Sequence, residues 1–121
     1  IAGIAGRTPQ PTSVITGAVN AALMNLTKSL AARGVAEGVR INVINPGAVR
    51  TGRFTERVEK RAHAKGVNLA EAEQQLVAEG GIMRVGEPDD IAGMVAYLLS
   101  ARARYIQGSV FDLDGGKTKT L

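Results

Sequence analysis

The chain has 121 residues, with 15 Lys and Arg against 11 Asp and Glu, no cysteine, no tryptophan and one histidine. The lack of cysteine excludes disulfide scaffolds, thiolate zinc sites and cysteine nucleophiles, and the single His63 argues against a histidine-ligated metal centre or a Ser-His-Asp triad. No apolar stretch approaches the roughly 20 residues of a transmembrane helix, and the first residues do not have the layout of a secretory signal. We therefore expect one soluble, cytoplasmic domain with no metal site and no membrane partner.

The net charge of +4 raises the question of nucleic-acid binding. That function needs basic residues clustered on one face, ideally with aromatic side chains that stack on bases. The densest basic run, over residues 53–65, is interrupted by Glu56 and Glu59, which is typical of a solvated helix face. We expect no nucleic-acid partner.

The first predicted element is a long helix over residues 13–33 that ends at Gly34. Its large apolar side chains recur at helical spacing, at Ile15, Val19, Leu23, Leu26 and Leu30. Alanines widen this stripe and few charges other than Lys28 interrupt it, so we expect burial on more than one side, against a sheet and against another subunit. Thr12 and Ser13 stand at its start, where hydroxyl side chains commonly act as caps.

A strand is predicted over residues 39–45, where β-branched residues alternate until Pro46 and Gly47 end the run. Two short helices are predicted between residues 51 and 81, with Asn68 and Glu71 as a capping pair. Their apolar residues define two faces, one made of Phe54, Val58 and Ala62 and the other of Leu69, Ala72, Leu76 and Val77.

A third helix is predicted from Pro88, a residue well suited to a first helical position, with a buried stripe of Ile91, Val95, Leu98 and Leu99. The last predicted element is a strand over residues 109–113, closed by the Asp-Gly-Gly turn at 114–116. Asp112 and Asp114 are assigned structural roles because they stand at a strand end before two glycines. Helices that alternate with strands predict an α/β layer.

Five motifs occur in an order that resembles the carboxy-terminal half of the short-chain dehydrogenase/reductase family. They are Gly-Ile-Ala-Gly-Arg at residues 3–7, the segments 20–31 and 40–47, Arg-Val-Gly-Glu-Pro-Asp-Asp-Ile-Ala at 84–92, and the segment 105–116. Motifs gain weight from such a context. The resemblance implies an α/β chain that forms the C-terminal part of a doubly wound Rossmann-like parallel sheet. Residues 1–121 would be the C-terminal portion of a single domain, without the family's N-terminal nucleotide-binding half.

In this family a serine orients the substrate carbonyl, a tyrosine transfers the proton, and a lysine four residues later lowers the pKa of the tyrosine. Alignment on the Ala-Ala-Leu segment at residues 21–23 places these roles at Gly3, Thr16 and Asn20. All three positions are substituted, and no Tyr-x-x-x-Lys occurs elsewhere in the sequence. An aliphatic alcohol is a far weaker acid than a phenol, and a neutral amide cannot replace an ammonium. Carbonyl reduction by the family's usual mechanism is therefore doubtful.

The segment after the first strand resembles the family loop that passes the nicotinamide carboxamide. Position by position, the resemblance implies Pro46, Gly47, Val49 and Thr51 as neighbours of NAD or NADP in an intact protein. The alternative is a sharp strand-to-loop turn, which Pro-Gly makes in many proteins. No glycine-rich phosphate-binding turn follows a strand here, so no cofactor is expected to bind this chain alone. Residues 52–81 match the variable region that covers the substrate.

The resemblance leaves two functions open. One is part of an NAD(P)-dependent oxidoreductase with altered or reduced activity, and the other is a catalytically silent subunit that acts in cofactor binding or assembly. Both need partners, because two strands and three apolar-faced helices leave much apolar surface bare. The partners implied are the chain's own N-terminal half and sister chains in a homodimer or homotetramer, through residues 13–33, 88–101 and 108–113.

Overall fold

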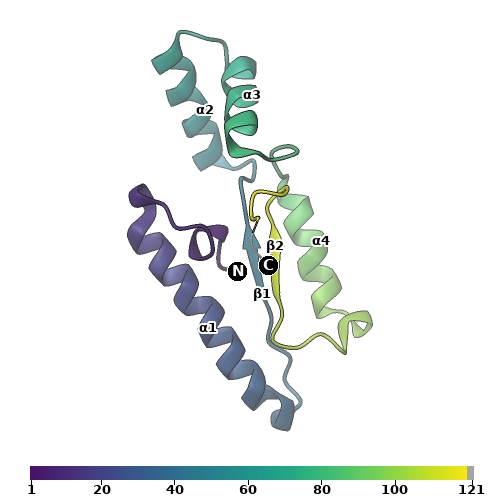
Figure 1. Ribbon diagram of the computed structural model, residues 1–121. Coiled ribbons are helices and arrows are strands. Elements are labelled where there is room, and N and C mark those ends of the chain that lie inside the picture. Colours follow the sequence, from purple (N-terminus) through teal and green to yellow (C-terminus); the bar gives the residue numbers. More distant parts are fainter. Residues whose placement is uncertain (120–121) are drawn as a thin grey trace.

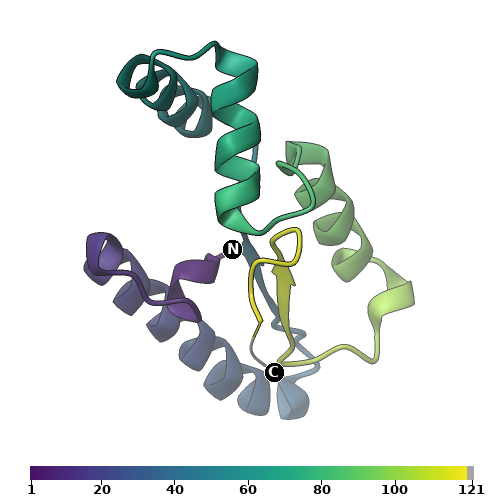
Figure 2. The ribbon, with the colours of Figure 1, turned by 45° about the horizontal axis from the view of Figure 1, so that its top comes forward.

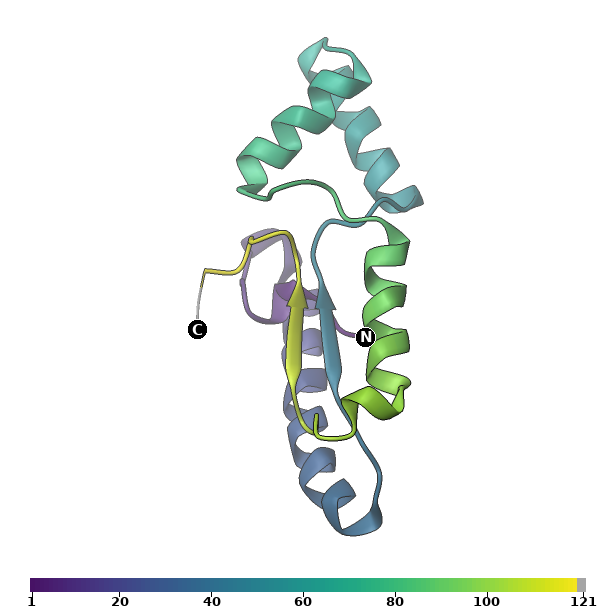
Figure 3. The same cartoon turned by 90° about the vertical axis from the view of Figure 1, so that its right-hand side faces the viewer.

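The computed structural model of the protein describes residues 1–119, which fold around a two-stranded parallel sheet. Strand β1 (Val43–Pro46) pairs with β2 (Val110–Leu113) in a register that places Asn45 opposite Asp112. Helix α1 (Val14–Glu37) covers one face of this sheet and α4 (Pro88–Leu99) the other, as Figures 1 and 3 show from two sides. Parallel strands between two helical layers are the arrangement of the predicted α/β class. Short 3₁₀ helices cover Ile4–Gly6 (η1), Pro11–Ser13 (η2) and Ala101–Ala103 (η3).

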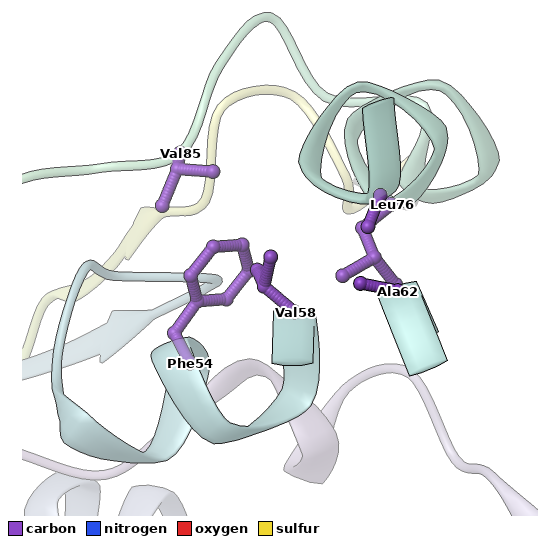
Figure 4. Close-up of a cluster of buried hydrophobic side chains, with 6 residues drawn as sticks. Phe54, Val58, Ala62, Leu76 and Val85 are labelled. Carbon is purple, nitrogen blue, oxygen red and sulfur yellow. The ribbon is translucent and has the colours of Figure 1, made fainter. Parts of the chain in front are cut away.

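Helices α2 (Gly52–Lys65) and α3 (Leu69–Gly80) form an antiparallel hairpin that stands beyond the carboxyl ends of the strands (Figures 1 and 2). As predicted, the Asn68 side chain caps α3, because its Oδ1 accepts the Glu71 N–H at 2.9 Å. Leu69 was predicted to share one apolar face with Ala72 and Leu76, but it is 56% exposed whereas they are buried, because the first turn of α3 lies at the tip of the hairpin. The hairpin is held by a cluster of buried side chains, drawn in Figure 4: Phe54, Val58, Ala62, Ala72, Leu76 and Val85.

Helix α1 continues past its predicted end to Glu37, where Gly38 adopts a left-handed conformation with φ 68°. Gly34 is therefore not the helix end but a buried position inside the last turns. A Cβ atom at Gly34 would overlap the carbonyl oxygen of Val39. The chain reverses so tightly after α1 that only glycine fits at this position.

The large apolar side chains of α1 do not face the sheet. The contact side of α1 is made of the small residues Thr27, Ala31 and Gly34, which let the helix approach closely. The predicted burial of the stripe against the sheet is wrong, because in the single chain its members are 39–81% exposed: Ile15, Val19, Leu23, Leu26 and Leu30. Helix α4 likewise has no buried residue, and Leu99 is 77% exposed.

The first strand is shorter at its start than predicted, because side chains replace the ladder before Val43. The Gln107 Nε2 donates to the carbonyl oxygens of Ala31 and Val39 at 2.8 and 2.9 Å, and its Oε1 accepts the Ile41 N–H at 2.8 Å. On the outer edge of β1, the Ala2 N–H donates to the Ile44 carbonyl at 2.9 Å. Residues at the front of the chain thus lie along the strand edge opposite β2.

Candidate functional site

The carboxyl ends of β1 and β2 lie at one edge of the sheet because the two strands are parallel. Helix α1 runs in the opposite direction, so its first turns reach the same edge (Figure 1). The loop of residues 46–51 leaves β1 there, below the α2–α3 hairpin. Ligands of open α/β sheets bind in the crevice outside the carboxyl ends of the strands, which makes this edge the candidate site.

Loop 46–51 is pinned from two sides. The Gly47 N–H donates to the Leu113 carbonyl of β2 at 2.9 Å, and the Arg50 N–H donates to the Gly86 carbonyl at 2.7 Å. A Cβ atom at Gly47 would lie 2.7 Å from the Cα of Asp114, closer than such atoms approach in proteins. Glycine at position 47 therefore allows the loop to pack directly on the turn after β2.

The structure places all four residues of the predicted cofactor contact, Pro46, Gly47, Val49 and Thr51, on this loop. Within residues 1–119, the backbone N–H groups of Val49 and Thr51 donate to no other residue. The exposed Thr51 hydroxyl donates to the Val49 carbonyl at 3.4 Å, a long bond, and does not cap α2. Open N–H donors beside a hydroxyl and a carbonyl suit a ligand amide, which needs both donors and acceptors. The donor set therefore fits a nicotinamide carboxamide.

The three residues aligned with the family's catalytic positions lie near the same edge. Thr16 and Asn20 are four residues apart and so share one side of α1, the side that Thr27 and Ala31 continue toward the sheet. Asn20 is half-buried, and a Cβ atom on Gly3 would lie 3.1 Å from its Nδ2. Gly3 and Asn20 are therefore neighbours, whereas Thr16 is exposed one turn closer to the start of the helix.

Hydroxyl groups gather where α1 begins. Thr12, Ser13 and Thr16 line a small pocket there. Ser13 makes no capping hydrogen bond, so its predicted role is wrong: the 3₁₀ turn η2 runs directly into α1. A larger cavity of about 500 Å³ adjoins this pocket, with an apolar lining that includes Ala5, Pro9, Pro11, Val14, Ala18 and Ala21.

A polar network beneath the site was not foreseen from the sequence. The Asp112 carboxylate accepts from Arg7 Nη1 at 2.7 Å and from Asn45 Nδ2 at 2.9 Å. Asn45 is fully buried, and its Oδ1 has no partner among the described residues. This network ties the segment between Gly3 and Thr16 to both strands. The signal available in the sequence was a polar side chain near the end of each predicted strand, Asn45 in the first and Asp112 in the second. Asp114 has the structural role expected of it, accepting three backbone N–H groups in the turn after β2.

Two groups of ion pairs lie near loop 46–51. The sequence analysis did not predict them. The Arg50 guanidinium binds both carboxylate oxygens of Glu73, at 2.7 and 2.8 Å, and Glu87 Oε1 at 2.9 Å. The hydrogen bonds from Arg50 lower the pKa of Glu73. At the start of α4, hydrogen bonds from the Arg84 side chain and the Glu87 N–H lower the pKa of Asp90 to about 2. The lowered pKa values keep the carboxylates of Glu73 and Asp90 ionised at neutral pH.

Metal and membrane sites are not seen in the described part of the chain. Within residues 1–119, no three His, Cys, Asp or Glu side chains come close enough to share a metal ion. None of the helices in that range has the length and apolar character needed to cross a bilayer. His63 is exposed in the last turn of α2, as expected of a solvated side chain.

Comparison with known proteins finds relatives over nearly the whole chain. A family profile described as Enoyl-(Acyl carrier protein) reductase matches residues 1–118. The NADPH-dependent reductase BacG of Bacillus subtilis is 31% identical over 103 residues, which make up 85% of this chain and 40% of BacG. The chain therefore spans less than half the length of this relative.

Solved structures match equally well. L-sorbose reductase from Gluconobacter frateurii, in complex with NADPH and L-sorbose, is 31% identical with a TM-score of 0.91, over 99% of this chain and 46% of that one. An NADPH-bound short chain oxidoreductase from Pseudomonas aeruginosa PAO1 that contains an atypical catalytic center is 30% identical with a TM-score of 0.84, over 98% and 44% of the two chains. The chain thus has part of an α/β Rossmann-like fold.

Proposed function

Because this chain belongs to the short-chain dehydrogenase/reductase family, we propose that the intact protein binds NADPH or NADH and works as an oxidoreductase of altered or reduced activity. The observation that carries the proposal is loop 46–51, pinned at the carboxyl edge of the sheet with the N–H groups of Val49 and Thr51 open. The relatives that use NADPH support a nicotinamide cofactor for the intact protein. This chain alone is not expected to bind one, because it lacks a glycine-rich turn for the pyrophosphate.

The chemistry of each side chain or backbone group at the site limits the role it can have in the reaction. Val49 and Thr51 would hold the carboxamide through backbone N–H groups and a hydroxyl, which orients the nicotinamide ring. A bound reduced nicotinamide supplies a hydride, and carbonyl reduction then needs a proton donor at the carbonyl oxygen. Thr16 and Asn20 can hydrogen-bond that oxygen from one side of α1, but neither is an acid that releases its proton readily near neutral pH. A proton from water or substrate would have to replace the phenol.

A catalytically silent subunit is the second candidate, and the substituted positions favour it. With Gly3, Thr16 and Asn20 in the three catalytic places, the chain keeps the cofactor-side loop but not the acid-base groups. General acid-base catalysis contributes on the order of 100- to 10,000-fold to a rate. A protein without acid-base groups would lose this rate enhancement but would still bind the cofactor and assemble.

Titration of the intact protein with NADPH and NADH, followed by nicotinamide fluorescence, tests both functions. The intact mass of the purified, denatured protein is measured first, because the proposal needs an N-terminal half in the same molecule or beside it. Addition of a panel of carbonyl compounds then follows turnover. Binding with turnover supports the oxidoreductase, binding without turnover supports the silent subunit, and no binding of either dinucleotide contradicts both as cofactor-binding proteins.

Assembly belongs to the same proposal. The bare apolar stripe of α1, with Leu23 and Leu26 at its middle, needs a cover in water. We assign that cover to the chain's own N-terminal half or to sister chains in a homodimer or homotetramer. The contact segments proposed are residues 13–33, 88–101 and 108–113.

A further inference from the structure

Among the described residues, one ion pair joins the α2–α3 hairpin to another part of the chain. Within the hairpin, Arg61 binds both carboxylate oxygens of Glu79, at 2.6 and 2.7 Å. Among the ion pairs of residues 1–119, the pair of Arg50 with Glu73 is the one that joins the hairpin to another part of the chain. The hairpin is also held by the packing of its cluster against Val85 and Ala48 and by a long hydrogen bond from Lys117 Nζ to the Gly80 carbonyl at 3.5 Å.

Arg50 lies near the end of the candidate cofactor loop, between Val49 and Thr51. Its backbone is fixed to Gly86, while its guanidinium reaches Glu73 on α3 and Glu87 at the start of α4. A two-pronged arginine–carboxylate pair fixes orientation as well as distance. The loop, the hairpin and the start of α4 therefore meet at a single side chain.

The hairpin is attached by glycines at both of its ends. Gly52 begins α2 with no neighbouring atom within 4 Å of the place of a Cβ, and Gly81 follows α3 in a left-handed conformation with φ 60°. Residues at the ends of such elements absorb the backbone rotation when a segment moves as a unit. Rotation at these two glycines would change the angle of the hairpin over the site, and the ion pair of Arg50 with Glu73 opposes that rotation.

We propose that Arg50 is a positioning residue that couples loop 46–51 to the α2–α3 hairpin, so that a nicotinamide dinucleotide held by the loop orders the hairpin over the substrate. This inference rests on the proposed function. Arg50 itself need not touch the cofactor, because it acts through Glu73 and Glu87. Coupling of this kind is reciprocal, so a molecule bound under the hairpin would also tighten cofactor binding.

Hydrogen exchange in the intact protein tests the coupling. Exchange of residues 69–80 is followed with and without NADPH or NADH, at a concentration that saturates each variant. The variants are Arg50→Met, Glu73→Gln, the double variant, and Arg50→Lys, which keeps the charge but not the fork. Arg61→Met is the matched control, because it breaks a pair of the same geometry inside the hairpin. Circular dichroism confirms that each variant is folded.

In the wild type and in Arg61→Met, we expect the dinucleotide to slow exchange in α3 by about fivefold or more, the lower range of typical coupling. Arg50→Met and Glu73→Gln should lose this effect, Arg50→Lys should keep part of it, and the double variant should be no worse than either single one. If a folded Arg50→Met protein bound dinucleotide and still showed the full effect, this inference would be wrong and the proposed function would stand. If the wild type bound neither dinucleotide, both would be wrong.

Discussion

The Asp112 carboxylate accepts from the half-buried Arg7 with one oxygen and from the buried Asn45 with the other. Its side chain and that of Arg7 are 17% and 27% exposed, so neither group is well hydrated. Loss of Asp112 would remove one acceptor from Arg7 and one from Asn45, in a place only partly open to water. The stability of the site edge therefore depends on a residue that contacts no proposed ligand.

Asp112→Leu should lower the free energy of unfolding of the intact protein by about 1–3 kcal/mol, because two partly buried donors lose a charged acceptor. Urea unfolding measures the change. Asp112→Asn, which keeps the shape and one oxygen acceptor, should cost less. Equal losses for the two variants would contradict the assigned role of the network.

Thr16 and Asn20 allow a gain-of-function experiment. In the intact protein, Thr16→Tyr combined with Asn20→Lys should raise the rate of NADPH-dependent ketone reduction by about 100- to 10,000-fold, the range of acid-base catalysis. Gly3 is left unchanged, since a Cβ there would crowd residue 20. The matched control is Thr16→Phe with Asn20→Met, which adds bulk without an acid or a charge. A wild-type protein already as fast as the Tyr-Lys variant would show that another group donates the proton.

At the scale of elements, the tight reversal after α1 sets the position of that helix. Gly34→Ala should destabilise the protein by about 1–3 kcal/mol, because the new methyl group meets the Val39 carbonyl oxygen. Gly93→Ala is the matched control on α4, where nothing lies within 4 Å, and should stabilise by about 0.5–1 kcal/mol. Denaturant unfolding distinguishes the two. A neutral Gly34→Ala would mean that the reversal is looser than described.

The start of α4 should respond to acid through Asp90. Its pKa in the folded protein is about 2, against 3.8 as the ordinary value, so the carboxylate stabilises the fold above pH 3.8 and loses that effect as the pH falls toward 2. The melting temperature of the wild type should exceed that of Asp90→Asn at about pH 5, and the difference should shrink toward pH 2. Asp89→Asn, in the same helical turn but without an ion pair within residues 1–119, should show no such narrowing.

The elements with strong local signals were predictable. Pro88 starts α4, the Asn68 cap starts α3, and the spacing of Phe54, Val58 and Ala62 gives the buried side of α2, because each signal acts within one or two turns. The covered side of α1 was not predictable. Large apolar residues mark a helix face that needs to be covered. In this structure, however, the sheet packs against the neighbouring face of α1, which is made of small residues.

The same limit applies to the site. Loop 46–51 and the substituted positions Gly3, Thr16 and Asn20 could be predicted, because aligning the motifs with the family assigns a role to each position along the chain. The contacts of Arg50 join residues 23 and 37 positions apart, and those of Asp112 span up to 105. Sequence spacing carries no signal for such pairs unless the topology is already known.

For the whole molecule, the exposed stripe of α1 predicts association. Residues 1–121 expressed alone should form particles larger than the 12.6 kDa of one chain in light scattering. Leu23→Glu with Leu26→Glu should shift them toward the monomer. Asn25→Glu, which places the same charge at an exposed position on the opposite side of the helix, should not. Monodisperse wild-type particles of 12.6 kDa would contradict the prediction.

The pairing of β1 with β2 also affects the order in which parts of the protein can fold during synthesis. Loop 46–51 is fixed by Leu113, and Asn45 meets Asp112 across 67 residues of sequence. At synthesis rates of about 5–20 residues per second, the ribosome needs roughly 3 to 13 seconds to make that stretch. During this interval the nascent chain already carries β1 and the loop, while the strand that holds them has not yet been made. The candidate site is therefore among the last parts of the chain to take shape.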